Sequence, residues 1–123
     1  MKKEFVPYEL AVKLKELGFD EPCLGNYRLP SNRLITEWEI NNTPEHVLGI
    51  SVPLYQQAFR WFREKYELYS TIMFRVSMED NNEYWDWLIK GEEVVYRHFK
   101  TYEEAELACL NKLIEIVQGG NNE

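Results

Sequence analysis

Hydrophobic and polar positions alternate most regularly in the segments 71–78, 84–90 and 94–100. A period of two residues is typical of strands with one buried face, so each segment is predicted to be a strand. The short spacers between the segments favour an antiparallel meander. The inner face of this meander is predicted to carry the apolar side chains of Phe74, Val76, Trp85, Trp87 and Phe99.

The spacers also predict a register for the meander. A two-residue turn at Asn81-Asn82 places Val76 opposite Trp87, and a turn near Gly91 places Trp85 opposite Phe99. In the first pairing, every opposed pair on the inner face is apolar, as a buried face requires.

Three other segments, 7–17, 51–69 and 101–117, have apolar residues at the spacing of three and four that indicates amphipathic helices. Ser51 is the expected N-cap of the central helix. Thr101, followed three residues later by a glutamate, is the expected cap of the last one. We expect both of these helices to pack on the inner face of the sheet.

Residues 20–50 are the least regular part of the chain. Alternation suggests a weaker hairpin, with one strand at 23–29 and the other at 34–40, turning through 30–32. The predicted fold is therefore a single α+β domain over 1–118 with an antiparallel sheet of three to five strands. Residues 119–123 are expected to form a frayed tail.

Composition supports a packed domain of this kind. The 123 residues are 45% hydrophobic and 15% aromatic, which is too apolar for a disordered chain. Two cysteines are too few for a disulfide framework, and no apolar run approaches the roughly 20 residues that span a membrane. We therefore expect a cytoplasmic protein with free thiols and no membrane partner.

The charge is acidic and unevenly distributed. The net charge is −7, and residues 101–123 contribute one lysine against five glutamates. Because like charge repels phosphate, broad electrostatic binding of nucleic acid is disfavoured, although a local site remains open.

Candidate chemistry is sparse. In the predicted register Ser77, Asp86 and His98 fall in a row, but a hydrolytic triad needs the imidazole in the middle. An acid–base pair of Asp86 with His98 and a solvated polar row remain as alternatives. The cysteines and histidines, Cys23, His46, His98 and Cys109, lack metal-ligand spacing, and the glycines form no phosphate-binding loop. We expect no catalytic, metal or cofactor site.

The meander face opposite the tryptophans is the candidate interaction face. Its composition of tyrosine, methionine and arginine is typical of protein interfaces. An alternative is that residues 20–50 cover this face, and another is that it stacks a nucleic-acid single strand. The candidate residues are Met73, Arg75, Tyr84, Asp86, Leu88, Tyr96, His98 and Lys100.

Four stretches resemble a family of small uncharacterised proteins from phages and integrated mobile elements of anaerobic gut bacteria. They read FVPYELA at 5–11, LKELGFDEPC at 14–23, PLYQQAFRWFREK at 53–65 and TYEEAELACL at 101–110. The resemblance covers about half of the chain and implies a bacterial, cytoplasmic context, with no activity, cofactor or site residue to carry over. The expected function is a non-enzymatic accessory protein that acts by protein–protein contact; the alternative is nucleic-acid binding.

Overall fold

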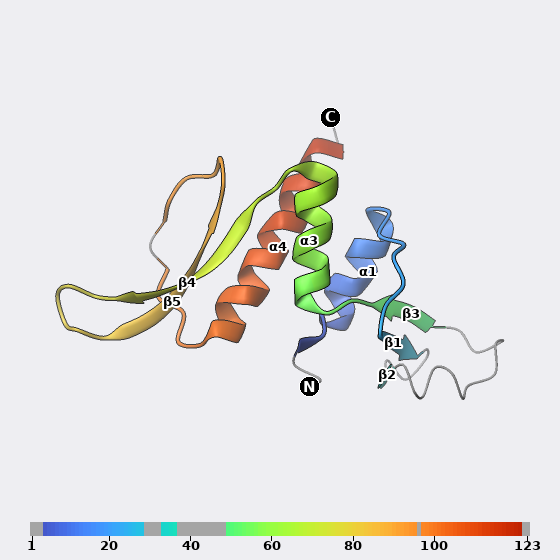
Figure 1. The fold of residues 1–123 in the computed structure, drawn as a ribbon, viewed down its shortest axis with the longest axis horizontal. Helices are drawn as coiled ribbons and strands as arrows, with labels where there is room; N and C mark the ends of the chain where they lie inside the picture. Colours follow the sequence, from blue (N-terminus) through green and yellow to red (C-terminus); the bar gives the residue numbers. More distant parts are fainter. Residues whose placement is uncertain (1–3, 29–32, 37–48, 96, 122–123) are drawn as a thin grey trace. The chain divides into compact units, whose positions relative to one another are not determined.

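The computed structural model describes residues 4–28, 33–36, 49–95 and 97–121, and it confirms an α+β fold. The described residues form three helices and two small antiparallel sheets, one of three strands and one of two (Figure 1). The chain divides into two compact units, Met1–Ala58 and Phe59–Glu123. The prediction of a single domain over 1–118 stays a prediction.

The first unit contains helix α1 (Tyr8–Glu16), which lies within the predicted range 7–17. Its end is closed as a Schellman motif, because the Phe19 N–H donates to the Leu14 carbonyl at 3.0 Å. Gly18 takes the left-handed backbone conformation that this motif needs, with a φ of 101°. Leu10 and Leu14 are buried, as the leucine spacing predicts.

The three-stranded sheet has the order β2-β1-β3, and both pairings are antiparallel. Strand β1 (Gly25–Arg28) and strand β2 (Arg33–Thr36) pair antiparallel, which confirms the strand pairing predicted between 23 and 40. The predicted turn at 30–32, with residue 29 and residues 37–40, lies outside the described residues. Strand β3 (Gly49–Val52) pairs with the other edge of β1. The described part of 20–50 thus supplies strands to this sheet.

Close packing in the first unit explains one glycine in the central strand. A side chain at Gly25 would meet the Phe5 ring and the Val52 methyl group, both at 2.7 Å from the added Cβ. The Tyr27 hydroxyl donates to the Val6 carbonyl at 2.9 Å and ties the sheet to the segment before α1. Phe5, Val6 and Val52 are all buried.

Helix α3 (Tyr55–Tyr66) is shorter than the predicted helix 51–69 at both ends. Ser51 is not its cap, since Ser51 lies in β3 opposite Asn26. Pro53 separates the strand from the helix, and its carbonyl accepts the Val6 N–H at 3.0 Å. At the other end, Glu67 adopts a φ of 55°, which ends the helical backbone.

The second unit is built on a hairpin of β4 (Ser70–Val76) and β5 (Glu83–Ile89). The strands are confirmed, but the predicted register is wrong by four residues: Ile72, not Val76, lies opposite Trp87. The connection spans 77–82 and contains its own hydrogen bonds, including Ser77 N–H to the Asn82 carbonyl at 2.9 Å. Because the displacement is even, every side chain keeps the face predicted for it.

The third strand of the predicted meander, 94–100, is absent from the described residues of that segment. Only Phe99 pairs with β5, in an isolated bridge to Trp85 that matches the predicted opposition. The reason is that a side-chain cluster around Asp86 occupies the β5 edge where a ladder would continue.

Helix α4 (Tyr102–Asn121) begins as the capping prediction requires and runs past the predicted end at 117. The Glu104 N–H donates to the Thr101 hydroxyl at 3.1 Å, and the Glu104 carboxylate accepts the Lys100 N–H at 3.4 Å. Helical backbone continues through Gly119 and Gly120 to Asn121, and the fraying of residues 119–123 stays a prediction. Glycine lowers helix stability by about 1 kcal/mol without forbidding helical angles.

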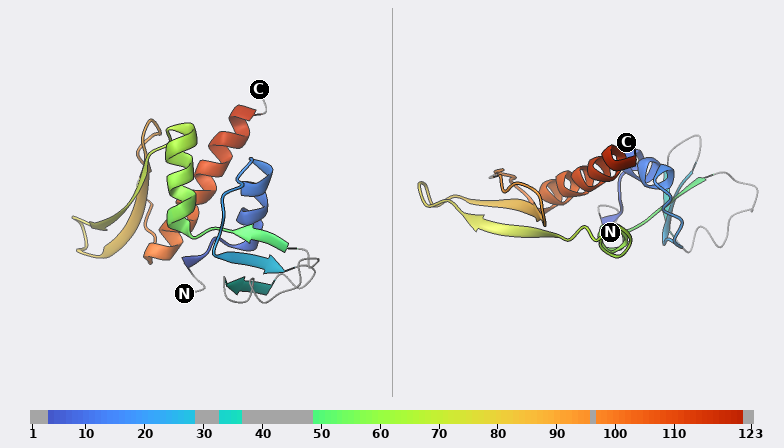
Figure 2. Two further views of the ribbon diagram at one scale, coloured as in Figure 1. Left: turned by 45° about the vertical axis from the view of Figure 1, so that its right-hand side comes forward. Right: turned by 90° about the horizontal axis from the view of Figure 1, so that it is seen from above.

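One face of α4 packs on the inner end of the hairpin, where Trp87 and Ile89 are buried. The outer end extends beyond α4 (Figure 2), and Phe74 and Val76 are 52% and 50% exposed there. Their predicted place in the core is therefore wrong: they lie on the predicted face, but none of the described helices covers them. The buried stripe of α4 consists of Ala105, Cys109, Leu110, Leu113, Ile114 and Val117.

Candidate interaction surface on the hairpin

The structure brings most of the candidate interaction residues together. Cross-strand pairs of Met73 with Asp86 and of Arg75 with Tyr84 place these four side chains on one hairpin face. Leu88 lies on the same face, opposite Thr71.

His98 makes an edge-on ring contact with Tyr84, with centroids 4.2 Å apart, and Lys100 lines a hollow beside these rings. Tyr96 lies outside the described residues.

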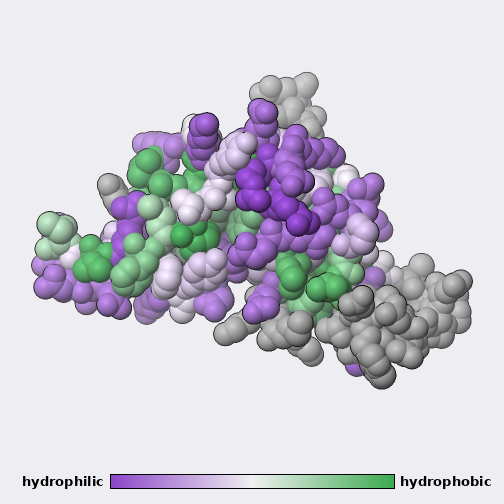
Figure 3. Space-filling view, viewed as in Figure 1, coloured by the Kyte–Doolittle hydropathy of each residue, from purple (hydrophilic) through white to green (hydrophobic). Residues whose placement is uncertain are grey.

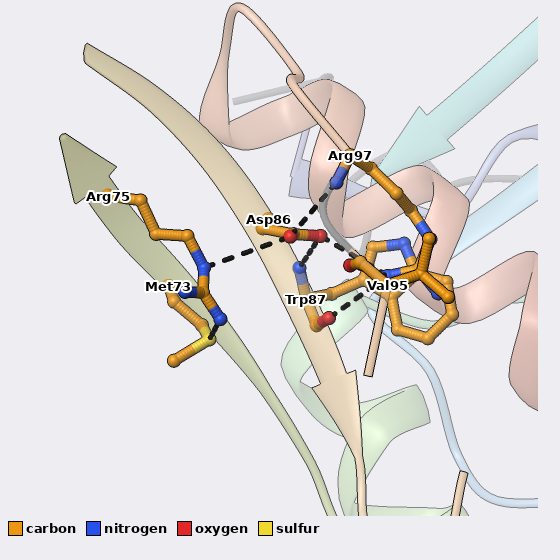
Figure 4. A network of polar contacts seen from close by, with 6 residues as sticks. All are labelled: Met73, Arg75, Asp86, Trp87, Val95 and Arg97. Carbon is orange, nitrogen blue, oxygen red and sulfur yellow. Dashed lines mark hydrogen bonds and ion pairs between the residues drawn. The ribbon is translucent and has the colours of Figure 1, made fainter. Parts of the chain in front are cut away.

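Asp86 is fully buried rather than part of a solvated row. Its Oδ1 accepts the Trp87 N–H at 2.7 Å, and its Oδ2 accepts the Arg97 N–H at 3.2 Å (Figure 4). Two guanidinium groups flank the carboxylate: Arg97 Nη1 lies 3.3 Å from Oδ1 and Arg75 Nε lies 3.8 Å from Oδ2. The burial of this charge is therefore compensated by ion pairs and hydrogen bonds.

Arg97 joins this carboxylate to the backbone on both sides. Its Nη1 also donates to the Trp87 carbonyl at 3.3 Å and to the Val95 carbonyl at 3.2 Å. The guanidinium carbon lies 3.6 Å from the centroid of the Trp87 ring, in cation–π contact. We call Asp86, Arg75 and Arg97 the carboxylate clamp, because they hold the segment before α4 against β5.

The geometry around Asp86 does not fit the acid–base pair of Asp86 with His98 that the sequence suggested. A general base must reach the proton that it takes, and the Asp86 carboxylate is enclosed by its donors. His98 contacts the Tyr84 ring, not Asp86. Ser77 lies beyond the end of β4, while Met73 occupies the position opposite Asp86. The predicted row of Ser77, Asp86 and His98 is therefore not formed.

The outer edge of β5 is occupied by the clamp and by Phe99. Trp85 exchanges backbone hydrogen bonds with Phe99, at 2.8 Å and 3.1 Å. At Trp87 the N–H donates to Asp86 and the carbonyl accepts from Arg97. These side chains take the place that a third strand would fill.

The outer edge of β4 is different. The Ser77 N–H donates to the Asn82 carbonyl, and the Lys90 N–H donates to the Tyr69 carbonyl. In the register of this ladder, the odd-numbered residues of β4 are therefore the ones whose backbone groups bond to β5. The N–H and C=O groups of Ile72, Phe74 and Val76 consequently point to the other edge. Within the described residues this sheet has two strands, so no third strand pairs with these groups.

An exposed apolar row follows this edge. Phe74, Val76 and Met78 are 52%, 50% and 97% exposed, and Figure 3 shows apolar surface toward the free end of the hairpin. The Phe74 ring packs edge-on against Trp85 at 5.3 Å, and Trp85 packs against Tyr102 of α4 at 5.4 Å. The row thus continues the packed aromatic face outward. The alternation along the strand predicted that Phe74 and Val76 share the apolar face, but their exposure depends on where α4 lies.

The tip of the hairpin is acidic. Residues 77–89 include Glu79, Asp80, Glu83 and Asp86 and no lysine or arginine. Asp80 shapes the tip, since its carboxylate accepts the Asn82 N–H at 3.0 Å, and this hydrogen bond lowers the pKa of Asp80. The acidic tip borders the open hollow of about 440 Å³ that Tyr84, His98 and Lys100 also line.

The two thiols are poor nucleophiles. Burial raises the pKa of Cys23 to about 11 and that of Cys109 to about 12, so both are protonated near neutral pH. Cys109 is fully buried on α4. A second hollow of about 440 Å³ lies in the first unit, beside Lys15, Asp20 and Gly49.

Within the described ranges, no group of three or more histidine, cysteine, aspartate or glutamate residues has the arrangement of a metal site. None of the described helices is both long enough and apolar enough to cross a membrane. In comparisons with known proteins, no family model, curated protein or solved structure matches this chain.

Proposed function

We propose that this chain is a non-enzymatic protein-binding module, an accessory protein of a phage or mobile element, and that its hairpin makes the contact. The observation that carries the proposal is the exposed apolar row of Phe74, Val76 and Met78, beside a strand edge that pairs with no third strand in the described part of the chain. The phage or mobile-element context rests on the resemblance of the four sequence stretches alone.

The apolar row supports a protein partner for an energetic reason. Covering apolar surface releases roughly 25 cal/mol per Å², and an aromatic ring with two aliphatic neighbours offers a compact area for such burial. Exposed apolar side chains that stand in line differ from the scattered ones that every surface carries. Their acidic border gives the contact a charged rim, as interfaces usually have.

The candidate face on the other side of the hairpin stays a prediction. Met73, Tyr84 and Leu88 are only partly exposed there, and Asp86 is buried. The nucleic-acid alternative relies on the region of Arg75, Arg97 and Lys100. Both arginines pair with Asp86, so no specific observation favours this alternative.

Affinity capture from a bacterial lysate, with nuclease added, tests the proposal. The informative variant is Phe74→Ser with Val76→Ser, because both side chains are half exposed and their loss costs little stability. The matched control is Val94→Ser with Val95→Ser, which removes two exposed valines elsewhere in the same unit.

We expect wild type and control to retain a protein partner that the hairpin variant loses. Equal capture by all three proteins would overturn the proposal, and so would recovery that disappears with nuclease.

A further inference from the structure

We infer that the partner contributes an extended segment, which adds to the outer edge of β4 as a third strand. The segment has apolar residues at alternate positions and lysine or arginine at the end beside residues 79–83. This inference rests on the proposed function and specifies the chemistry of its partner. Three features of the hairpin carry it: the unpaired main-chain groups, the side chains beside them and the charge of the tip.

The main-chain groups set the pairing. Ile72, Phe74 and Val76 direct their N–H and C=O groups outward, spaced two residues apart, as an incoming strand requires. On the opposite edge of the sheet, Asp86, Arg97 and Phe99 occupy the corresponding groups of β5. Of the two edges of this two-stranded sheet, the β4 edge is therefore the one that the described residues leave available for strand addition.

The side chains beside this edge set the alternation. A strand next to β4 would place every second side chain alongside Phe74 and Val76, on the face that continues to Trp85. Its other side chains would lie along Met73 and Arg75, where a polar residue is compatible with the clamp. An apolar–polar alternation in the partner fits both faces.

The tip sets the charge of the partner. Glu79, Asp80 and Glu83 stand within five residues and are exposed, with no basic residue between 76 and 90. Lysine or arginine at the adjoining end of the segment gains an attraction that salt screens. A second copy of this chain is a poorer occupant, because two chains of charge −7 repel each other.

The experiment is a selection of random 12-residue displayed peptides against the full chain, followed by affinity measurements on the enriched peptides. We expect enriched sequences with apolar residues at every second position and a basic cluster at one end. Acidic sequences, apolar residues at helical spacing or no enrichment over background would each overturn the inference.

Two pairs of variants separate strand addition from other contacts. Phe74→Ala removes the ring and keeps the N–H, whereas Phe74→Pro also removes the outward N–H, a change that edge strands tolerate. We expect Phe74→Pro to bind the selected peptide about fivefold more weakly than Phe74→Ala, as one lost hydrogen bond predicts. Circular dichroism confirms that each variant is folded.

The charge pair is Glu79→Gln with Glu83→Gln, compared with Glu92→Gln and Glu93→Gln at the other end of β5. We expect the first pair alone to weaken binding, about threefold at low salt and less at high salt. Asp80 is left in place because it builds the tip.

The results distinguish the inference from the proposed function. If a lysate partner depends on Phe74 and Val76 but Phe74→Pro and Phe74→Ala bind the peptide equally, the hairpin contact stands and strand addition fails. If the chain associates with itself and Phe74→Pro abolishes that association, the occupant is a second copy and the inferred partner is wrong. If the lysate experiment finds no dependence on the hairpin, the proposed function itself fails.

Discussion

The two outer edges of the β4–β5 hairpin differ in whether their outward backbone groups are hydrogen-bonded, although the two strands share one ladder. Along β5, the backbone groups of Trp85 and Trp87 are bonded to Phe99, Asp86 and Arg97. Along β4, the outward groups of Phe74 and Val76 meet no third strand in the described chain. The β5 edge is closed by a few side chains and a single bridge. The β4 edge keeps outward backbone groups with the spacing that a further strand would need.

This difference teaches how an edge is closed without a strand. A buried aspartate accepts the N–H of the next residue, and an arginine from a neighbouring segment donates to the carbonyl. Proteins commonly protect strand edges with inward-pointing charges, since open edges pair with other chains. Among the described residues no comparable side chains close the β4 edge, and this edge beside an exposed apolar row is the basis of the proposed contact.

Breaking the clamp gives the largest expected effect. Asp86→Ala removes the carboxylate that both Arg75 and Arg97 pair with and leaves the Trp87 N–H without its acceptor. We expect the free energy of unfolding to fall by about 3 kcal/mol, measured by urea denaturation. A loss below about 1 kcal/mol would mean that the clamp does not hold the β5 edge closed.

Truncating matched aliphatic side chains sharpens the contrast between the packed and exposed parts of the hairpin. Ile89→Ala, at a buried position, should cost about 2–3 kcal/mol in the free energy of unfolding. Val76→Ala, at a half-exposed position, should cost about 0.5 kcal/mol or less. Equal losses from the two changes would show that the outer half of the hairpin is packed.

Alkaline pH provides a smaller effect at the covered end of the hairpin, where Ser70 hydrogen bonds to Cys109. The folded-state pKa of this thiol is raised from 9.0 to about 12, chiefly by burial. The stability that the buried neutral thiol contributes is present below pH 9 and is lost as the pH rises toward 12. This group should lower the free energy of unfolding by about 1 kcal/mol between pH 9 and pH 10.

Cys109→Ala is the control for this pH dependence. Urea denaturation as a function of pH should show a shallower alkaline loss in Cys109→Ala than in wild type. Identical slopes for the two proteins would contradict the assignment of this loss to the buried thiol.

Local sequence signals predicted much of the fold. The N-cap of α4, the end of α1 and the alternation of β4 and β5 depend on neighbouring residues, and the structure confirms these predictions. The predicted start of α3 was wrong. Residues Gly49–Val52 form a strand because they pair with β1, and the local spacing of apolar residues does not encode this contact.

The candidate surface was less predictable for the same reason. Alternation assigned Phe74 and Val76 to the apolar face, but their exposure depends on the length of hairpin that α4 covers. Asp86 belonged by pattern to a polar row, yet its burial follows from Arg97, eleven residues away. Alternation along the strands predicted the sheet face of these side chains, whereas tertiary packing determined which of them are covered.

Amide hydrogen exchange along β4, followed by NMR on the isolated chain, tests the open edge most directly. Within one strand, the inward-bonded amides of Met73 and Arg75 should exchange slowly and the outward amides of Phe74 and Val76 rapidly. Added selected peptide should slow Phe74 and Val76 and leave the inward pair unchanged. Equal protection of all four amides in the free chain would contradict an open β4 edge.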